Sequence, residues 1–370
     1  MTPKIRNIYA GGNTARGFHS FFDSVLQGLD RLFILKGGPG TGKSSLMKAV
    51  GETFYKRGFD IEYIHCASDN GSIDGVLIPF LNVGIVDGTA PHVIEPKVPG
   101  AVEEYVNLGA AWDSEQLIPQ KAAITRITDR ISECYRNAYA TFSEALAIHD
   151  EWEKFYITNM DFAEANKVTE ELIQRFFGNQ RQFKEPKVRH MFFGAATPAG
   201  AVDHIQNLTG DLQKRFFIKG RPGSGKSTML KSLAAAAEQR GFDVEVYHCG
   251  FDPNSLDMVL LPELSLCIFD STAPHEYFPS KDKDEIVDMY ARTITPGTDE
   301  KYATELLEIQ GRYSSKMKAA TAFLQEAKSL HDELEAIYIA AMDFTKVDAI
   351  TADLISQIAR LAQVKETSEY

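Results

Sequence analysis

Two short segments of the chain combine the residue types and the spacing that hold the phosphates of a nucleotide. Both fit the pattern G-x-x-x-x-G-K-[ST], and with the hydroxyl residue after each they comprise Gly37, Gly38, Pro39, Gly40, Thr41, Gly42, Lys43, Ser44 and Ser45, and Gly220, Arg221, Pro222, Gly223, Ser224, Gly225, Lys226, Ser227 and Thr228. The glycines let the backbone wrap around a phosphate with its N–H groups turned inward. In this pattern the lysine, Lys43 or Lys226, reaches the β- and γ-phosphate oxygens, and the serine, Ser44 or Ser227, ligates Mg²⁺.

The two loops belong to a unit that occurs twice. A constant offset of 183 residues relates them, and the same offset places His65-Cys66 on His248-Cys249. Self-similarity at a fixed period indicates repeated structural units. We therefore expect two homologous domains, residues 1–183 and 184–370, joined by a polar linker. Each comprises a core followed by a helical arm: cores at about 1–100 and 184–280, arms at about 101–178 and 281–365.

Strands that alternate with helices must position these loops. A short apolar run, Arg31–Lys36 or Lys214–Lys219, enters each loop, and a helix follows from Lys43 or Lys226. This order predicts an α/β fold with a parallel sheet sandwiched by helices. The rest of each repeat has apolar residues at helical spacing, and it predicts a long helix (120–157; 302–339) and a shorter one (162–177; 344–362). We expect each such pair to form a helical hairpin arm.

The chain resembles a P-loop NTPase duplicated in tandem. Its GxPG[TS]GKS loops, Gly37–Ser44 and Gly220–Ser227, are similar to those of AAA-type and related ATPases. The whole arrangement also resembles an uncharacterised bacterial family of predicted ATPases or nucleotide kinases. The likeness covers residues 31–92 and 214–275, and the arms fall outside it. It implies ATP or another nucleoside triphosphate, together with Mg²⁺, and supplies no second substrate.

An aspartate ends the next apolar run of each repeat. Asp87 and Asp270 close segments that have the form of a Walker B strand, so each carboxylate is expected to hold Mg²⁺ through water. An aspartate in a turn or helix cap is the alternative. Many ATPases of this class carry a glutamate directly afterwards, but here Gly88 and Ser271 follow. This departure puts fast hydrolysis in doubt or moves the water-orienting role elsewhere.

Several polar residues compete for that role. His92 and His275 lie five residues past the aspartate and are candidates to sense the γ-phosphate, with a hydrogen-bonded loop histidine as the alternative. Asp69 and Asp252 follow a strand, at the end where parallel sheets bind ligands, and are further candidates; a turn residue is the slightly favoured alternative. Asp74 and Asp257 are interpreted as helix caps. The pairs His65-Cys66 and His248-Cys249 are interpreted as packing, because adjacent strand residues point to opposite faces.

Basic residues and one helical stripe complete the candidates. Lys36, Lys219, Arg221 and the repeat pairs Arg6 with Arg189 and Arg130 with Arg312 are candidates to stabilise phosphate charge, with surface ion pairs as the favoured alternative. On the arms one helical face repeats in both copies: His149, Glu153, Tyr156 and Met160, and His331, Glu335, Tyr338 and Met342. We expect this stripe to pack on the core of its own repeat. A surface for a protein partner or an acceptor substrate is the alternative.

Composition excludes some classes of protein. The formal net charge is −12, which argues against nucleic acid as the main ligand. Four cysteines without a C-x-x-C pair argue against a disulfide framework and favour reduced thiols in the cytoplasm. We expect no signal peptide and no membrane span.

Three functions fit these residues. The first is a Mg-dependent ATPase with two sites. The second is a nucleotide or small-molecule kinase that uses the same ATP sites and binds its acceptor at the arms. The third is a nucleotide-gated switch or scaffold with little hydrolysis. The choice between ATP and GTP, the activity of each site and the oligomeric state stay open.

Overall fold

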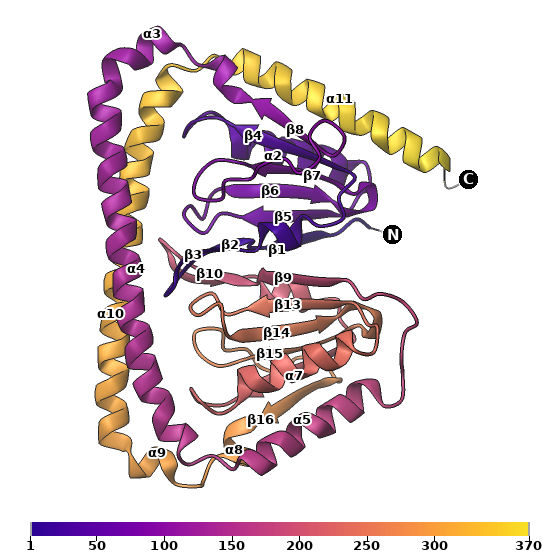
Figure 1. The fold of residues 1–370 in the computed structure, drawn as a ribbon, viewed down its shortest axis with the longest axis vertical. Helices are drawn as coiled ribbons and strands as arrows, with labels where there is room; N and C mark the ends of the chain where they lie inside the picture. The colour runs from indigo at the N-terminus through magenta and orange to yellow at the C-terminus, as the bar shows by residue number, and fades with distance from the viewer. Residues whose placement is uncertain (1, 369–370) are drawn as a thin grey trace.

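Two six-stranded sheets with the same strand order form the centre of the molecule (Figure 1). The computed structural model describes residues 2–368. Across the first sheet the strands are β1 (Ile5–Ile8), β5 (Ile61–His65), β6 (Ile73–Ile78), β7 (Val83–Asp87), β4 (Arg31–Lys36) and β8 (Glu103–Asn107). Across the second sheet they are β9 (Val188–Phe192), β13 (Val244–His248), β14 (Leu256–Leu261), β15 (Leu266–Asp270), β12 (Lys214–Lys219) and β16 (Asp284–Asp288). The fold is therefore α/β, as the sequence predicts.

One strand of each sheet runs against the others. β6 pairs antiparallel with β5 and β7, and β14 pairs antiparallel with β13 and β15, whereas the other pairs are parallel. The link from β5 to β6 is a tight turn in which the Ser72 N–H donates to the Asp69 carbonyl, too short for a parallel crossover. The expectation that Asp74 and Asp257 cap helices is wrong, because both lie within these antiparallel strands.

Each sheet is covered by one helix of its own repeat and one helix of the other repeat. α2 (Lys43–Lys56) and α11 (Phe344–Ser368) cover the first sheet, and α7 (Lys226–Glu238) and α5 (Phe162–Phe177) cover the second (Figure 1). Leu354 and Ile358 of α11 share a buried cluster with Met47 of α2. The last helix of each repeat, α5 or α11, therefore covers the sheet of the opposite repeat.

The two long helices pair with each other. α4 (Lys121–Ile157) and α10 (Ala303–Ala340) lie antiparallel along one side of both sheets (Figure 1). The expected hairpins within one repeat are therefore wrong. α4 has 37 residues, and at a rise of 1.5 Å per residue it extends about 55 Å, so it carries the chain from the first sheet to the second. Each helix in residues 2–368 is too short or too polar to span a bilayer.

Small residues let this helix pair approach closely. Ala138 and Phe142 of α4 bury against Ala320 and Leu324 of α10, and Ala15 of a short hairpin joins them. The shorter elements are β2 (Gly11–Thr14), β3 (Gly17–Ser20), β10 (Gly194–Thr197), β11 (Gly200–Asp203), α1 (Phe22–Val25), α3 (Ser114–Leu117), α6 (Ile205–Thr209), α8 (Met289–Thr293) and α9 (Thr298–Lys301).

The two sheets meet edge to edge. Tyr9 and Phe192, just after β1 and at the end of β9, exchange two backbone hydrogen bonds of 3.0 and 2.9 Å. α1 packs on β9 of the other repeat, and α6 packs on β1. Buried side chains from both repeats form one continuous cluster across this seam, so the halves share a core.

Candidate functional site

Each glycine-rich loop joins the end of a central strand to the start of a helix. Gly40 and Gly42 adopt φ angles of +66° and +88°, and α2 begins at the next residue, Lys43. Gly223 and Gly225 adopt +74° and +82° before α7. These left-handed conformations are available to glycine at little cost, which explains the glycines at these positions. Among the described residues, no side chain caps either helix start, so the first N–H groups remain open to an anion.

The lysine of each loop folds back over the loop's own carbonyls. Lys43 Nζ donates to the Gly37 and Gly38 carbonyls at 3.1 and 2.8 Å, and Lys226 Nζ donates to the Arg221 carbonyl at 2.9 Å. The ammonium group of each lysine therefore lies against the backbone of its own loop. A positive charge beside inward-turned amides is suited to a phosphate chain.

Hydroxyl groups fix the loops and their helices. Thr41 donates to the Gly38 carbonyl at 2.8 Å and Ser224 to the Arg221 carbonyl at 2.7 Å. Ser44 Oγ accepts from the Ile73 N–H at 3.1 Å, and Ser227 Oγ accepts in the same way from Leu256. Each of these two oxygens keeps a second lone pair for a metal ion. The next residues, Ser45 and Thr228, are exposed.

The aspartates predicted to hold a metal lie beside these lysines. Asp87 Oδ2 is 3.6 Å from Lys43 Nζ, and Asp270 Oδ2 is 3.5 Å from Lys226 Nζ. The other oxygen of Asp87 accepts from the N–H and hydroxyl of Thr89, which fixes the carboxylate, and Thr272 does the same for Asp270. The structure therefore brings together the loop, the lysine and the aspartate of each repeat.

Sequence reasoning missed a second carboxylate at each site. The antiparallel pairing ends with Gly75 opposite Val86 and with Met258 opposite Phe269, so Asp74 and Asp87, and likewise Asp257 and Asp270, are the next residues along neighbouring strands. Burial raises the pKa of Asp74, and burial together with the charge of Asp270 raises that of Asp257. Cys66 and Cys249 contribute hydrogen bonds to these carboxyls. The available signal was the presence of the aspartate in both repeats within an otherwise apolar run.

The two sites differ at their histidines. His92 Nε2 lies 3.6 Å from Asp74, and its buried Nδ1 has no hydrogen-bond partner among residues 2–368. His275 Nδ1 instead lies 2.8 Å from Asp203, which also accepts from Tyr277. Burial opposes protonation of His275, but the hydrogen bond with Asp203 and the charges of Asp257 and Asp203 outweigh it and raise the pKa of this histidine. His92 therefore contacts Asp74 of the first site, whereas His275 contacts Asp203 and only lies within the field of Asp257 and Asp270.

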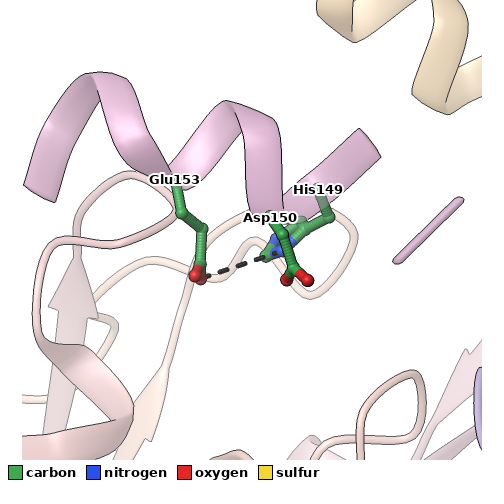
Figure 2. Close-up of side chains that lie close together, drawn as sticks. All are labelled: His149, Asp150 and Glu153. Atoms are coloured by element: carbon green, nitrogen blue, oxygen red, sulfur yellow. Dashed lines mark ion pairs between the residues drawn. The ribbon is translucent and has the colours of Figure 1, made fainter. Parts of the chain in front are cut away.

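The helical stripe of each arm lies on the loop of the opposite repeat. A Cβ placed on Gly223 would be 2.7 Å from the Glu153 carbonyl of α4, and one on Gly40 would be 2.9 Å from the Glu335 carbonyl of α10. His149, Asp150 and Glu153 project from the same side of α4 (Figure 2). The expectation that the stripe packs on its own core is wrong, because the long helices carry it across the molecule.

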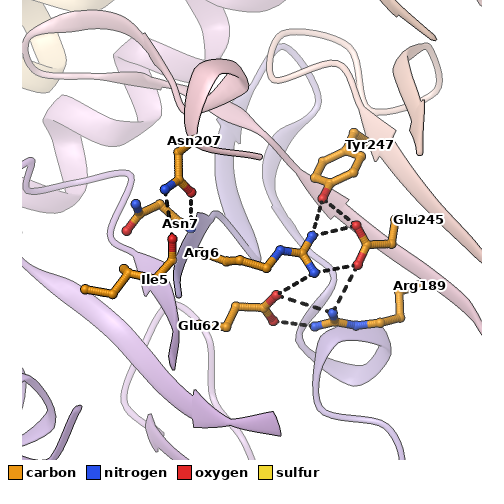
Figure 3. A network of polar contacts seen from close by, with 8 residues as sticks. All are labelled: Ile5, Arg6, Asn7, Glu62, Arg189, Asn207, Glu245 and Tyr247. Carbon is orange, nitrogen blue, oxygen red and sulfur yellow. Dashed lines mark hydrogen bonds and ion pairs between the residues drawn. The ribbon is translucent and has the colours of Figure 1, made fainter. Parts of the chain in front are cut away.

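The candidate arginines are engaged elsewhere. Arg6 donates to Glu245 and Tyr247, and Arg189 donates to Glu62, in a network at the seam between the sheets (Figure 3). Asn207 pairs with Asn7 and the Ile5 carbonyl beside it (Figure 3). Arg130 and Arg312 pair with Glu326 and Glu151 between the long helices. Arg221 pairs with Asp299 at 2.9 Å and lies over Tyr290.

The remaining polar candidates hold the loops in shape. Lys36 donates to the Gly88 and Ile94 carbonyls, and Lys219 makes the equivalent contacts. Asp69 accepts from Gly71 and Ser72, so it is a turn residue, and Asp252 accepts from the Asn254 N–H in the same way.

No protein-family model, curated protein or solved structure matches the chain. The chemistry of the two sites is therefore argued from their own geometry. Each offers an amide-lined loop, one ammonium group, one hydroxyl oxygen and two neighbouring carboxylates.

Proposed function

We propose that the chain binds two Mg²⁺–ATP molecules, one at each loop of two P-loop NTPase-like halves, and hydrolyses ATP. The observation that carries the proposal is one constellation built twice: a loop with left-handed glycines that opens a helix, and a lysine within 3.6 Å of the aspartate that ends the neighbouring strand. A chance turn has no reason to be accompanied by the same lysine and aspartate in both repeats. The free thiols suit a reducing compartment such as the cytoplasm.

The donor set fits Mg²⁺. This ion prefers oxygen ligands and keeps several waters, so one hydroxyl and one carboxylate near the phosphates suffice. Ser44 with Asp87, and Ser227 with Asp270, would hold the ion. Bound there, Mg²⁺ would neutralise charge on the phosphate oxygens.

The protein groups then have separate tasks. The loop amides and the helix start bind the phosphate chain. Lys43 or Lys226 exchanges its loop carbonyl partners for β- and γ-phosphate oxygens and stabilises the charge that develops on them. Thr89 and Thr272 keep the aspartate carboxylates in place. Water attacks the γ-phosphorus, and ADP and phosphate leave.

Replacement of the loop lysines tests the proposal. We expect two ATP-binding events of full affinity in the wild-type chain, one in Lys43→Ala or Lys226→Ala, and only weakened binding in the double variant. The affinity at a changed site should fall about 10- to 100-fold, because a charge-assisted hydrogen bond contributes about 1.5–3 kcal/mol. Titration calorimetry measures this. Lys56→Ala, on the same helix but far from the loop, is the control. Unchanged affinity in the double variant refutes the assignment.

A nucleotide-gated switch is the second candidate function. The observation that favours it is that α4 contacts the second loop and α10 contacts the first, while the two helices pack along each other and so connect the two sites. If ATP and ADP produce different hydrogen exchange along α4 and α10 while phosphate release stays slow, the switch is the better description.

A further inference from the structure

We infer that each nucleotide site is completed by a glutamate from the opposite repeat: Glu153 of α4 serves the second loop, and Glu335 of α10 serves the first. Each carboxylate holds the attacking water and accepts its proton. This inference rests on the proposed ATP hydrolysis, and it names the base that the sequence leaves unassigned. Gly88 and Ser271 follow the metal-binding aspartates, so neither strand end supplies a glutamate of its own.

The second loop shows the contact in most detail. The α4 backbone at Glu153 lies so close to Gly223 that a Cβ on this glycine would be 2.7 Å from the Glu153 carbonyl. The Glu153 carboxylate receives a hydrogen bond from the Gly223 amide, and it lies within the field of Lys226. The glutamate is thus held at the loop, beside the group that is expected to bind the γ-phosphate.

The first loop repeats this arrangement with residues from the other arm. A Cβ on Gly40 would be 2.9 Å from the Glu335 carbonyl, and one on Gly38 would be 3.0 Å from the Tyr338 ring. In each arm a histidine one turn earlier faces the glutamate: His149 Nδ1 is 3.8 Å from Glu153, and His331 Nδ1 is 3.8 Å from Glu335. The approach of the helix backbone to the loop and the histidine–glutamate pair occur in both halves, which favours a shared role over incidental packing.

Access to solvent separates these glutamates from the other carboxylates. The side chains of Glu153 and Glu335 are 35% and 31% exposed, so water reaches them. The side chain of Asp74 is 7% exposed and is engaged by His92 and Cys66. Asp87 is fixed by Thr89 and assigned to the metal. The arm glutamates are therefore more accessible to a mobile water than Asp74.

The reaction balances with these groups. The water oxygen forms a bond to the γ-phosphorus while the bond from the γ-phosphorus to the β–γ bridging oxygen breaks. The leaving electron pair stays on the ADP oxygen. The water's proton passes to the Glu153 or Glu335 carboxylate and then to solvent, so ATP and water yield ADP and inorganic phosphate.

Variants that combine one loop-lysine substitution with one arm-glutamate substitution test whether the glutamate acts and which loop it serves. The Lys43→Ala chain keeps only the second loop, and in it Glu153→Gln should lower single-turnover phosphate release about 100-fold, the scale of a lost general base. The Lys226→Ala chain keeps only the first loop, and in it Glu335→Gln should have the same effect. If the arms acted within their own repeats, Glu335→Gln would instead lower the rate of the second loop, and that result overturns the inference.

Binding separates this inference from the proposed function. ATP affinity, measured by titration calorimetry, should change less than threefold in Glu153→Gln and Glu335→Gln, which also shows that both variants fold. Glu151→Gln and Glu333→Gln, two residues along the same helices, are matched controls that should keep wild-type phosphate release. A wild-type chain that binds ATP without releasing phosphate overturns the inference and leaves nucleotide binding standing. A wild-type chain that binds no ATP overturns the proposed function itself.

Discussion

Substitution of Gly223 by alanine would test the contact between the arm and the loop. Gly223 has a φ of +74°, and a Cβ there would lie 2.7 Å from the Glu153 carbonyl and 3.0 Å from the Ile157 side chain. Gly28 has the same φ of +74° with no atom within 4 Å of the corresponding Cβ position, so it is a matched control. Gly28→Ala should lower the free energy of unfolding by about 1–2 kcal/mol, because alanine is strained in the left-handed conformation. Gly223→Ala should cost about 2–5 kcal/mol, because overpacking adds about 1–3 kcal/mol.

The extra cost arises because the obstacle is helix backbone, which no side-chain rotation can relieve. Urea unfolding gives the two free energies, and hydrogen exchange at the end of α4 reports whether the arm moves away from the loop. If the two variants lost equal stability and exchange at 150–157 stayed at the wild-type rate, the arm would not rest on the loop in solution. The contact on which the trans glutamate depends would then be refuted.

Two further perturbations act away from the sites. Burial lowers the pKa of His248 to about 4 in the folded chain, below its unfolded value near 6.5. The stability that the neutral ring contributes is therefore present above pH 6.5 and is lost as the pH falls toward 4. Urea unfolding should show a free energy of unfolding that decreases from pH 7 to pH 4, and His248→Gln should make this decrease smaller by about 1–2 kcal/mol. In the same assay at pH 7, Glu62→Gln should lower the free energy of unfolding by about 3–5 kcal/mol, because Glu62 is 2% exposed and pairs with Arg189 at 2.6 Å. Glu52 is exposed, so Glu52→Gln should lower it by less than about 0.5 kcal/mol.

The sequence was sufficient to predict those parts of the fold that local signals determine. Both loops, the helices that begin at Lys43 and Lys226 and the helix Phe162–Phe177 lie where the pattern places them. Glycines with left-handed φ angles and apolar residues at helical spacing act within a few residues, so they can be recognised without tertiary information. The same holds for Asp87 and Asp270 at the ends of buried strands.

The antiparallel strands were harder to recognise. β6 and β14 are buried along their whole length, so they lack the alternation of polar and apolar residues that marks a half-exposed strand. Each begins next to a serine and an aspartate, which also suit a helix cap. Only the strand pairing, which ends with Gly75 opposite Val86, brings the adjacent Asp74 and Asp87 to the same candidate site.

The exchange of arms could not be predicted because duplication makes the alternatives locally equivalent. α5 and α11 follow the long helix of their own repeat in the same order, so the order of elements does not show which sheet each helix covers. The choice is made by the unbroken length of α4 and α10, which end beside the opposite sheet. The packing of α4 against α10 therefore determines which sheet each short helix covers. These two helices are far apart in the sequence, so no local sequence pattern records their pairing.

The two halves nevertheless differ in the residues around His92 and His275. The loops, lysines, aspartates and arm glutamates are kept in both, but Asp203 and Tyr277 of the second half correspond to Ser20 and Ile94 of the first. His275 therefore has a carboxylate partner that raises its pKa, whereas the corresponding Nδ1 of His92 is buried without a partner among residues 2–368. Within the described part of the chain, the hydrogen bond between His275 and Asp203 therefore has no counterpart at His92 of the first half. The residues proposed to bind phosphate are thus present in both halves, while the hydrogen-bond partners of the neighbouring histidines differ, and we predict that the two sites differ in their affinity for Mg²⁺–ATP.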